Sequence, residues 1–507
     1  MFDQLFAKTQ EFTKLAQALG TPGACALFGI PGAGRAMVYA ALARHTGAPL
    51  CIVTPGEAEA TRFAGDLNVL GIPAAVFPAR DYLLRPIEGT GREYEYRRLS
   101  VLGDLVGGRL RAVCVPQEAL TQYTTPRADF CANTRTLHAG DTLPREELTA
   151  LLYGAGYTRR AQVDGPGQFS VRGDIVDIYA PDMKQPVRME FWGDEIDTLH
   201  TFDLATQRRD ESISKIYVSP AREVLLGAPP AAAELLRAFL KKQRGKKRTA
   251  LESCLAPELN QLDAGVMPVN MDKYLAVRYP EPATVLDYLD EPLLIFEEPA
   301  SVKEAQRAAD FRRGEELAAL LQDGVLAAGL GDLYANAAWL WAQTGRYPTI
   351  CAENFVRSMP DIPLKIVVNA PAHTLPAWSG EVAALLEDVN PLCSGGAAVT
   401  VMAGTARAAA GLANDLRTHG LQVTTDAAAA PAAGLVQVLP GQLSAGCSLP
   451  FAKYAVITAR AFGVSSVQKK KKRSKDTLNS LSEISEGDLV VHQNHGIGRY
   501  AGIQRMT

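Results

Sequence analysis

Residues 29–36 of this chain have the spacing of a phosphate-binding loop, in which glycine, lysine and hydroxyl side chains act together on a nucleotide. The frame is G-x-x-x-x-G-K-[ST]: glycines let backbone N–H groups approach phosphate, the lysine reaches the β- and γ-phosphates, and the hydroxyl binds Mg²⁺. Here Gly29, Gly32 and Gly34 keep the glycine-rich part, but Arg35 replaces the lysine and Ala36 the hydroxyl. Arginine presents a wide planar fork instead of a compact ammonium, and alanine offers the metal no oxygen. We therefore expect a degenerate loop with little or no ATP turnover.

The flanking residues predict the elements that position this loop. A buried strand is predicted at residues 24–28, a helix at 35–44 and a second apolar strand at 50–53. Together they form a β-α-β unit, in which the loop joins a strand to a helix. An ordinary glycine-rich strand-to-helix turn is the alternative interpretation, and the sequence leaves it open.

A second segment with nucleotide-site character lies far along the chain. Residues 293–296 are apolar and predict a buried strand, and Glu297 and Glu298 follow directly. ATPases hold Mg²⁺ with an aspartate at the end of such a strand, and here glutamate replaces it. One hypothesis is that Glu297 and Glu298 are the partner half of the same lost nucleotide site. The other is a surface turn.

The composition is that of a globular protein with several domains. The chain has 507 residues, and its 52 Lys and Arg against 55 Asp and Glu give a net charge of −3. No bulk positive charge therefore indicates nucleic-acid binding. The eight cysteines form no C-x-x-C pair, which predicts free thiols in a reducing compartment. We find no export signal and no apolar run that would span a bilayer, and so predict a cytoplasmic protein without membrane contact.

The apolar pattern predicts an α/β protein of several domains with mainly parallel sheets. Period-two runs at 168–172, 174–179 and 187–192 predict a small antiparallel sheet. Basic runs at 241–248 and 469–475 are either solvated segments or weak nucleic-acid contacts. The predicted parts are an α/β domain containing the degenerate loop at 25–124, an inserted small α+β domain at 125–213, a helical domain at 1–24 and 214–340, a second small α/β domain at 346–465, a basic linker at 466–485 and the start of a small β-rich domain at 486–507.

Three stretches of the sequence resemble one family, the bacterial transcription-repair coupling factors. Residues 156–159, 167–178 and 189–196 are similar to the domain by which UvrB and the coupling factors bind UvrA. Residues 490–500 resemble the opening of the coupling factors' RNA-polymerase-interacting domain, with His492, His495, Gly496, Gly498, Arg499 and Tyr500 as the motif. The degenerate loop is the third stretch, because the UvrB-like module of this family lacks a working ATP site. No metal site is predicted, since His492 and His495 lack further ligands nearby.

The resemblance implies which residues bind UvrA. The family's contacts fall on Arg159 and Arg172, with Phe169, Ser170 and Gly173 completing the expected site. Ser170 stands where UvrB has an arginine, so this contact departs from the UvrB pattern. From the residues themselves, an exposed arginine beside Phe169 suits hydrogen-bonded ion pairs with an acidic partner surface. The alternative is a solvated arginine at a strand end that contributes little.

The resemblance also implies a function. The chain would be the amino-terminal, helicase-like but ATPase-free part of a coupling factor. It would be a monomeric adaptor without a cofactor that recruits UvrA, a nucleotide excision repair protein, to RNA polymerase stalled at DNA damage. In the parent protein, a downstream motor would use ATP and Mg²⁺ to move on double-stranded DNA, and the completed terminal domain would bind the polymerase β subunit. Only residues 82–97 fill the interval where UvrB has a long DNA-gripping hairpin. The alternative is a divergent nucleotide-dependent DNA helicase or ATPase of the UvrB class.

Overall fold

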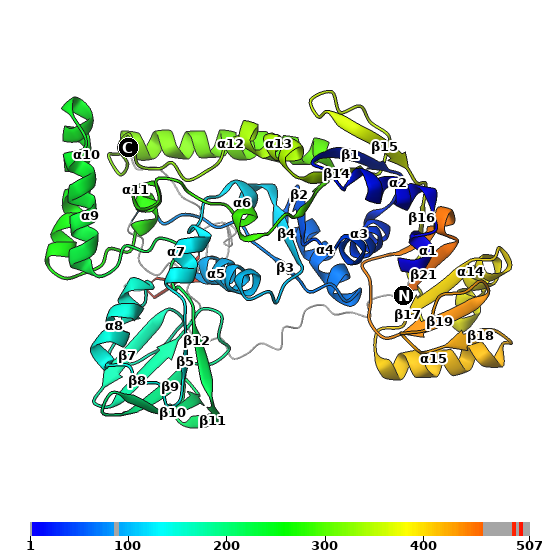
Figure 1. Cartoon of the computed structure of the whole chain (residues 1–507), viewed down its shortest axis with the longest axis horizontal. Helices are drawn as coiled ribbons and strands as arrows, with labels where there is room; N and C mark the ends of the chain where they lie inside the picture. Colours follow the sequence, from blue (N-terminus) through cyan, green and yellow to red (C-terminus); the bar gives the residue numbers. More distant parts are fainter. Residues whose placement is uncertain (1–2, 86–90, 460–488, 493–495, 500–507) are drawn as a thin grey trace.

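The structure is a computed structural model and describes residues 3–85, 91–459, 489–492 and 496–499 (Figure 1). A central α/β body carries a β-rich unit, a helical arm and a second, smaller α/β unit. The predicted class, a multidomain α/β protein with a parallel sheet and a small β-rich part, is confirmed at this level.

A seven-stranded sheet forms the central body, in the order β15-β1-β14-β13-β2-β4-β3, and every neighbouring pair is parallel. One face packs against α2, α3 and α4, and the other against α5, α6 and α13. Because helices cover both faces, the inner strands are apolar along their whole length. The elements are α1 Asp3–Phe6, α2 Gln10–Ala18, β1 Gly23–Phe28, α3 Gly32–Thr46, β2 Leu50–Thr54, α4 Glu57–Val69, β3 Ala74–Val76, α5 Glu93–Val106, β4 Ala112–Pro116, α6 Gln117–Thr121, α7 Arg127–Ala132, β13 Leu293–Glu297, α13 Ala337–Arg346, β14 Pro348–Glu353 and β15 Leu364–Asn369.

The β-rich unit is a six-stranded sheet in the order β11-β10-β9-β8-β7-β6, which is antiparallel except that the edge strand β6 runs parallel to β7. A ribbon of β5 and β12 and the helix α8 complete its core. The alternation predicted for residues 168–192 is confirmed. The elements are β5 Arg135–His138, α8 Arg145–Gly154, β6 Thr158–Arg159, β7 Gln168–Arg172, β8 Ile175–Tyr179, β9 Val187–Trp192, β10 Glu195–Phe202, β11 Arg209–Ile213 and β12 Lys215–Val218.

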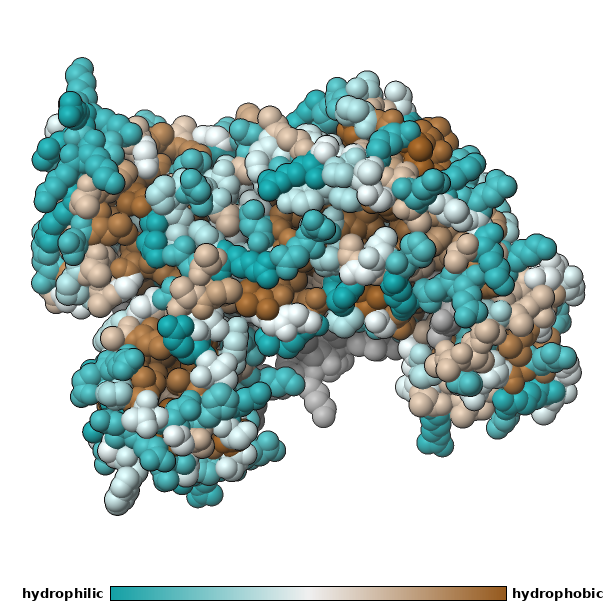
Figure 2. Space-filling model, viewed as in Figure 1, coloured by the Kyte–Doolittle hydropathy of each residue, from teal (hydrophilic) through white to brown (hydrophobic). Residues whose placement is uncertain are grey.

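The helical arm projects from one side of the body (Figure 1) and is largely hydrophilic on its surface (Figure 2). The basic run at 241–248 lies at the turn between its two long helices, and its lysines and arginines are exposed. This position suits both interpretations of the run, which stay open. Its elements are α9 Pro229–Lys241, α10 Gly245–Asp263, η1 Met271–Tyr274 and α11 Leu275–Arg278. The following η2 Val285–Tyr288 and α12 Pro299–Gln322 lie against the central body, where η2 packs on α5 and α12 packs on α6, β13 and β14.

The second α/β unit has a mixed sheet in the order β16-β20-β21-β17-β19-β18 and shares a hydrophobic core with the central body. Cys447 and Leu449 of β20 lie in the same apolar cluster as α3. Ser444 donates from its backbone N–H and its hydroxyl to the Asp66 carboxylate of α4, at 2.7 and 2.6 Å. The elements are β16 His373–Leu375, α14 Val382–Ser394, β17 Ala398–Met402, α15 Ala406–Thr418, β18 Gln422–Thr424, β19 Leu435–Leu439, β20 Gly446–Leu449, η3 Pro450–Ala452 and β21 Tyr454–Thr458.

The sheets do not follow the predicted domain ranges everywhere. The range 214–340 was expected to be helical apart from one strand at 293–296, and this strand, β13, lies inside the central sheet. The range 346–465 was expected to form the second α/β domain, but its strands β14 and β15 also join the central sheet. Helix α2, from the range 1–24, packs on β15 and α3 and not on the helical arm. The reason is physical: an apolar strand shows its burial in the sequence but not which sheet it joins.

The end of the chain is described only in part. Strands β22 Leu489–His492 and β23 Gly496–Arg499 form an antiparallel pair, within the range where the start of a β-rich domain was expected. His495, Tyr500 and the expected linker at 466–485 lie outside the described residues. Within the described ranges, no helix is long and apolar enough to cross a membrane. All eight cysteines are free thiols, and five of them are buried.

Candidate functional site

The degenerate loop leads from β1 into α3, as the sequence predicted. Gly29 has a φ of 87°, a left-handed conformation that favours glycine. A Cβ there would also lie 3.1 Å from the Asn369 side-chain oxygen of the β15 end. Helix α3 then begins at Gly32 and is buried from Ala33 to Ala43. The loop therefore has the backbone shape of a phosphate-binding loop, but its helix lies inside the protein.

Arg35 joins α3 to the ends of two central strands. Its Nη1 lies 2.9 Å from Glu297 Oε2, and its Nη2 lies 2.9 Å from Glu298 Oε1. The same guanidinium donates to the Ala352 carbonyl at 3.1 Å and to the Asn354 side-chain oxygen at 3.2 Å. The structure thus brings the two predicted halves of the nucleotide site together. It does not support a surface turn at Glu297, which is 2 % exposed.

Glu297 is held in a buried, hydrogen-bonded setting, whereas the Glu298 side chain is 33 % exposed. Burial raises the pKa of Glu297, and the neighbouring Arg35 guanidinium opposes part of that shift. Tyr39, on the next turn of α3, donates its hydroxyl to Glu297 Oε1 at 2.5 Å. Burial acts to lower the pKa of Arg35, but the Glu297 and Glu298 carboxylates raise it overall, which keeps the guanidinium charged.

This arrangement does not fit a magnesium–nucleotide complex. The only cation in the lysine position is bonded to two carboxylates and is 2 % exposed. Ala36 is fully buried and supplies no oxygen for a metal. In the part of the chain that the structure describes, no three His, Cys, Asp or Glu side chains are placed to hold a metal ion. The cluster ties two strands to a helix, and the guanidinium in the lysine position is already bonded to carboxylates.

The expected UvrA-binding residues lie at the β6 edge of the β-rich unit. Arg159 is exposed in β6, and no hydrogen bond or ion pair holds its side chain among the described residues. Arg172, at the end of β7, is 45 % exposed and lies 2.5 Å from the carboxylate of Asp177 in β8. Asp177 is fully buried and also accepts from Arg188 at 2.7 Å. Arg172 is therefore partly engaged inside the unit, whereas Arg159 is not.

Two of the expected contact residues are buried and present almost no surface to a partner. Phe169 is fully buried, and its ring meets that of Tyr153 edge-on at 5.3 Å. Ser170 is 1 % exposed, and its hydroxyl has no hydrogen-bond partner in the described structure. Gly173 forms the β7–β8 turn with a φ of 60°. The sequence could have warned of the burial of Phe169, which alternates with polar residues, but the same alternation places Ser170 on the opposite face, where it pairs with Asp177.

The strand register separates the two arginines. Arg159 pairs with Phe169, and Arg172 lies an odd number of residues further along β7, so the two point to opposite faces of the sheet. Trp192, at the end of β9, is 83 % exposed. It lies near the β7–β8 turn that follows Arg172, because the N–H of the neighbouring Phe191 donates to the Asp174 carbonyl of that turn. Trp192 is a candidate contact that the sequence analysis missed. The alternation along 187–192 places it opposite Phe191, which faces the core.

Comparison with curated proteins gives matches along nearly the whole chain. The transcription-repair-coupling factor of Bacillus subtilis (strain 168) is 28 % identical over 497 residues, covering 95 % of this chain and 42 % of that protein. The factor of Staphylococcus haemolyticus is 22 % identical over 444 residues, covering 85 % of this chain and 38 % of its own length. The chain is a homologue of transcription-repair-coupling factors. It spans less than half of the length of these relatives.

Two family matches fall on the expected parts of this coupling-factor homologue. Residues 136–224 match the family described as the UvrB interaction domain. This range holds the sheet from β6 to β11 and most of the β5–β12 ribbon, so it ends later than the expected boundary at 213. Residues 484–507 match the family described as the CarD-like/TRCF RID domain and include β22 and β23. The resemblance seen in the sequence is therefore confirmed.

Proposed function

We propose that this coupling-factor homologue is an adaptor that binds UvrA through the β6 edge of its β-rich unit. The observation that carries the proposal is the match of residues 136–224 to the UvrB interaction domain, on a unit whose edge presents an unengaged arginine. Within the longer parent protein, this docking would bring UvrA to RNA polymerase stalled at DNA damage. The polymerase β subunit, double-stranded DNA, ATP and Mg²⁺ would be bound by parts of the parent that include segments beyond this chain.

The edge has the chemistry of a protein-binding surface. A partner that straddles β6 can contact Arg159 from one face and Arg172 with Trp192 from the other. Arginine and tryptophan are the side chains that most often dominate binding energy at protein interfaces. Guanidinium groups bind carboxylates in a bidentate manner, so the preferred partner surface is acidic. These residues support the proposal more strongly than the buried Phe169 and Ser170 do.

The adaptor carries no ATPase in this proposal. Arg35, which would have to bind phosphate, is already paired with Glu297 and Glu298. A triphosphate at this site would meet an excess of carboxylate charge, since one guanidinium faces two carboxylates. The alternative of a divergent UvrB-class helicase gains no support from this geometry.

The first prediction tests the docking edge. Arg159→Ala should weaken the binding of UvrA by about fivefold or more, because truncation of an interface arginine commonly costs at least 1 kcal/mol. Arg172→Ala should also weaken binding, with a small loss of thermal stability because buried Asp177 then keeps only Arg188. Dissociation constants measured by surface plasmon resonance and thermal melts would separate the two effects.

Arg208→Ala is the matched control, because Arg208 is exposed beside β11, at the opposite edge of the same sheet. It should bind UvrA as the unmodified chain does. Unchanged affinity in the Arg159→Ala, Arg172→Ala double variant would disprove the docking edge.

A further inference from the structure

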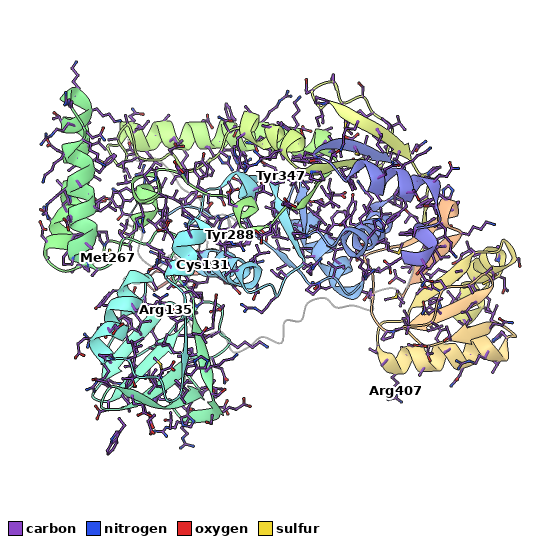
Figure 3. The ribbon with its side chains drawn as sticks, viewed as in Figure 1. Cys131, Arg135, Met267, Tyr288, Tyr347 and Arg407 are labelled. Atoms are coloured by element: carbon purple, nitrogen blue, oxygen red, sulfur yellow. The ribbon has the colours of Figure 1, made fainter. Side chains whose placement is uncertain are left out.

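A cleft beside Arg159 joins the docking edge to the helical arm. The cavity has a volume of about 450 Å³ and lies where β6, the start of α5, the segment after β12 and the loop after α10 meet. Met267, in the loop after α10, lies at the end of the arm nearest the β-rich unit (Figure 3). The proposed UvrA-binding edge is therefore one wall of a cleft and not an isolated strand.

The cleft has an excess of positive charge. Four arginines line it, Arg92, Arg159, Arg160 and Arg222, against the two carboxylates of Glu95 and Asp272. Asp272 forms an ion pair with Arg80, whose Nη1 and Nη2 donate to the two carboxylate oxygens at 2.8 and 3.0 Å. Four positive and two negative groups leave two positive charges unbalanced, which suits an acidic ligand.

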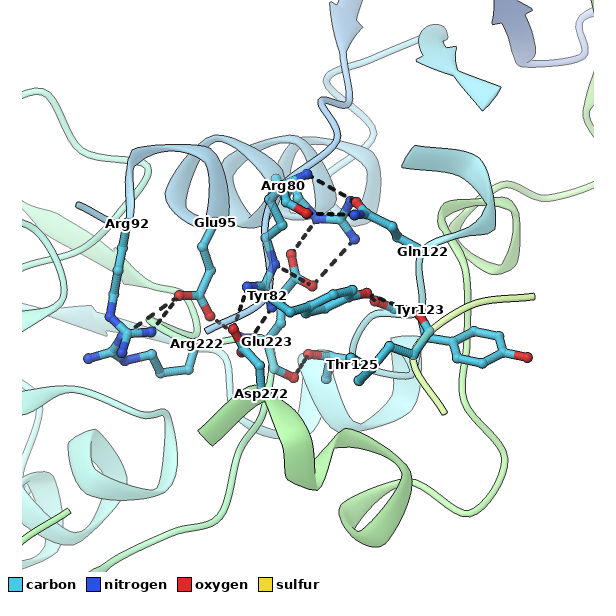
Figure 4. Close-up of polar contacts among 12 residues, drawn as sticks. Arg80, Tyr82, Arg92, Glu95, Gln122, Tyr123, Thr125, Arg222, Glu223 and Asp272 are labelled. Atoms are coloured by element: carbon cyan, nitrogen blue, oxygen red, sulfur yellow. Dashed lines mark hydrogen bonds and ion pairs between the residues drawn. The ribbon is translucent and has the colours of Figure 1, made fainter. Parts of the chain in front are cut away.

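The two carboxylates do not neutralise the arginines equally. Arg92 and Arg222 converge on Glu95 (Figure 4), at 2.9 Å for Arg92 and 3.7 Å for Arg222. Arg222 Nη1 is buried and has no hydrogen-bond partner in the described structure. Arg160 is exposed, and its side chain has no bonded partner within the described ranges. Arg159 and Arg160 therefore offer guanidinium donors to a carboxylate, and Arg222 can offer only the part of its side chain that is exposed.

The other wall of the cleft is apolar and exposed. Val266 is 55 %, Met267 36 % and Val269 52 % exposed. Arg92 donates to the Val269 carbonyl at 2.8 Å and so fixes this loop against α5. Exposed apolar side chains beside arginines favour a protein segment over a nucleic-acid backbone, because a phosphate chain would leave the apolar surface uncovered.

We infer that this cleft receives an acidic segment with an apolar side chain from the partner that docks at the β6 edge. The inference rests on the proposed function, so the partner is UvrA. Carboxylates of the segment pair with Arg159, Arg160 and Arg222, and its apolar side chain packs on the Val266–Val269 loop. The helical arm thereby contributes to binding together with the β-rich unit.

The test compares the affinity for UvrA of the full chain and two cleft variants. Arg160→Ala, and separately Val266→Ser combined with Val269→Ser, should each weaken binding by about fivefold or more. Arg208→Ala is the control for a lost arginine. Val367→Ser is the control for a lost exposed valine, because Val367 is 59 % exposed on β15 of the central sheet. Both controls should stay within about twofold, a change of only about 0.4 kcal/mol.

The outcomes separate this inference from the proposed function. If both cleft variants bind UvrA normally while Arg159→Ala binds weakly, the inference about the cleft is disproved and the proposal of the docking edge is kept. If Arg159→Ala, Arg172→Ala and the cleft variants all bind UvrA normally, both the docking edge and the cleft are disproved as UvrA-binding sites. A short DNA duplex serves as a second ligand. Weaker duplex binding by Arg160→Ala with unchanged UvrA affinity would assign the cleft to nucleic acid and overturn the inference.

Discussion

At the scale of single residues, the bonding partners of Arg35 explain why a charged side chain can be buried in the degenerate loop. An arginine buried at 2 % exposure without partners would be very costly, but this one is bonded to two carboxylates and two further oxygens. Buried ion pairs do not always stabilise relative to apolar residues, yet the removal of one partner is severe because the other charge stays buried. The arginine in the lysine position of the loop therefore makes a structural contact with Glu297 and Glu298.

The second prediction concerns this contact. Arg35→Met should destabilise the central body by about 3–5 kcal/mol, because Glu297 would be left buried without its cation. Adding Glu297→Gln should recover part of the loss, since a neutral amide is less costly to bury than a carboxylate. Urea unfolding followed by far-ultraviolet circular dichroism measures both changes. If Arg35→Met unfolds at the same urea concentration as the unmodified chain, the contact is not structural.

At the scale of elements, α3 is held by close packing on both sides. Gly34 lies in its first turn, where an added Cβ would lie 2.7 Å from Ile30 Cγ2 and 3.3 Å from Leu449 Cδ2 of the second α/β unit. Gly65 in α4 is also helical, but a Cβ there meets nothing within 4 Å. The two glycines therefore have opposite roles, although both lie in helices of the structure.

The third prediction uses this matched pair. Gly34→Ala should destabilise the protein by about 1–3 kcal/mol through overpacking. Gly65→Ala should stabilise it by up to about 1 kcal/mol, because alanine is the better helix former and space is available. Thermal melts of the two variants should shift in opposite directions. A stabilising Gly34→Ala would show that α3 and β20 are not in close contact.

At the scale of the whole molecule, the central sheet joins segments that lie far apart in the sequence. Strand β14 lies between β1 and β13, although it follows β1 by more than 300 residues. The second α/β unit then covers α3 with Cys447 and Leu449, and Ser444 bonds to Asp66. The units share cores and cannot be separated at the predicted boundaries without exposing apolar surface.

The fourth prediction follows from this topology. A fragment of residues 1–340 lacks β14, so β1 and β13 lose their common neighbour, and we expect it to aggregate or to lack a cooperative unfolding transition. A fragment of residues 1–459 keeps every strand of the central sheet and of the second unit and should unfold cooperatively. Size-exclusion chromatography and circular dichroism melts distinguish the two. A monodisperse, cooperatively unfolding 1–340 fragment would contradict the sheet order.

The sequence by itself determined the local chemistry. The spacing around Gly29 and Gly34 predicted the loop between a strand and a helix, and Arg35 with Ala36 predicted that it would not suit a nucleotide. Period-two alternation predicted strands β7, β8 and β9. These features are readable because they depend on neighbours within a few residues, where backbone geometry fixes side-chain direction.

Only the tertiary structure decided which distant segments meet. It placed Glu297 and Glu298 on Arg35, buried the polar Ser170, and set Arg159 and Arg172 on opposite faces of one edge. It also inserted β13, β14 and β15 into the central sheet. Local periodicity shows that a strand is buried but not which strand covers it, because that choice depends on the packing of the entire chain.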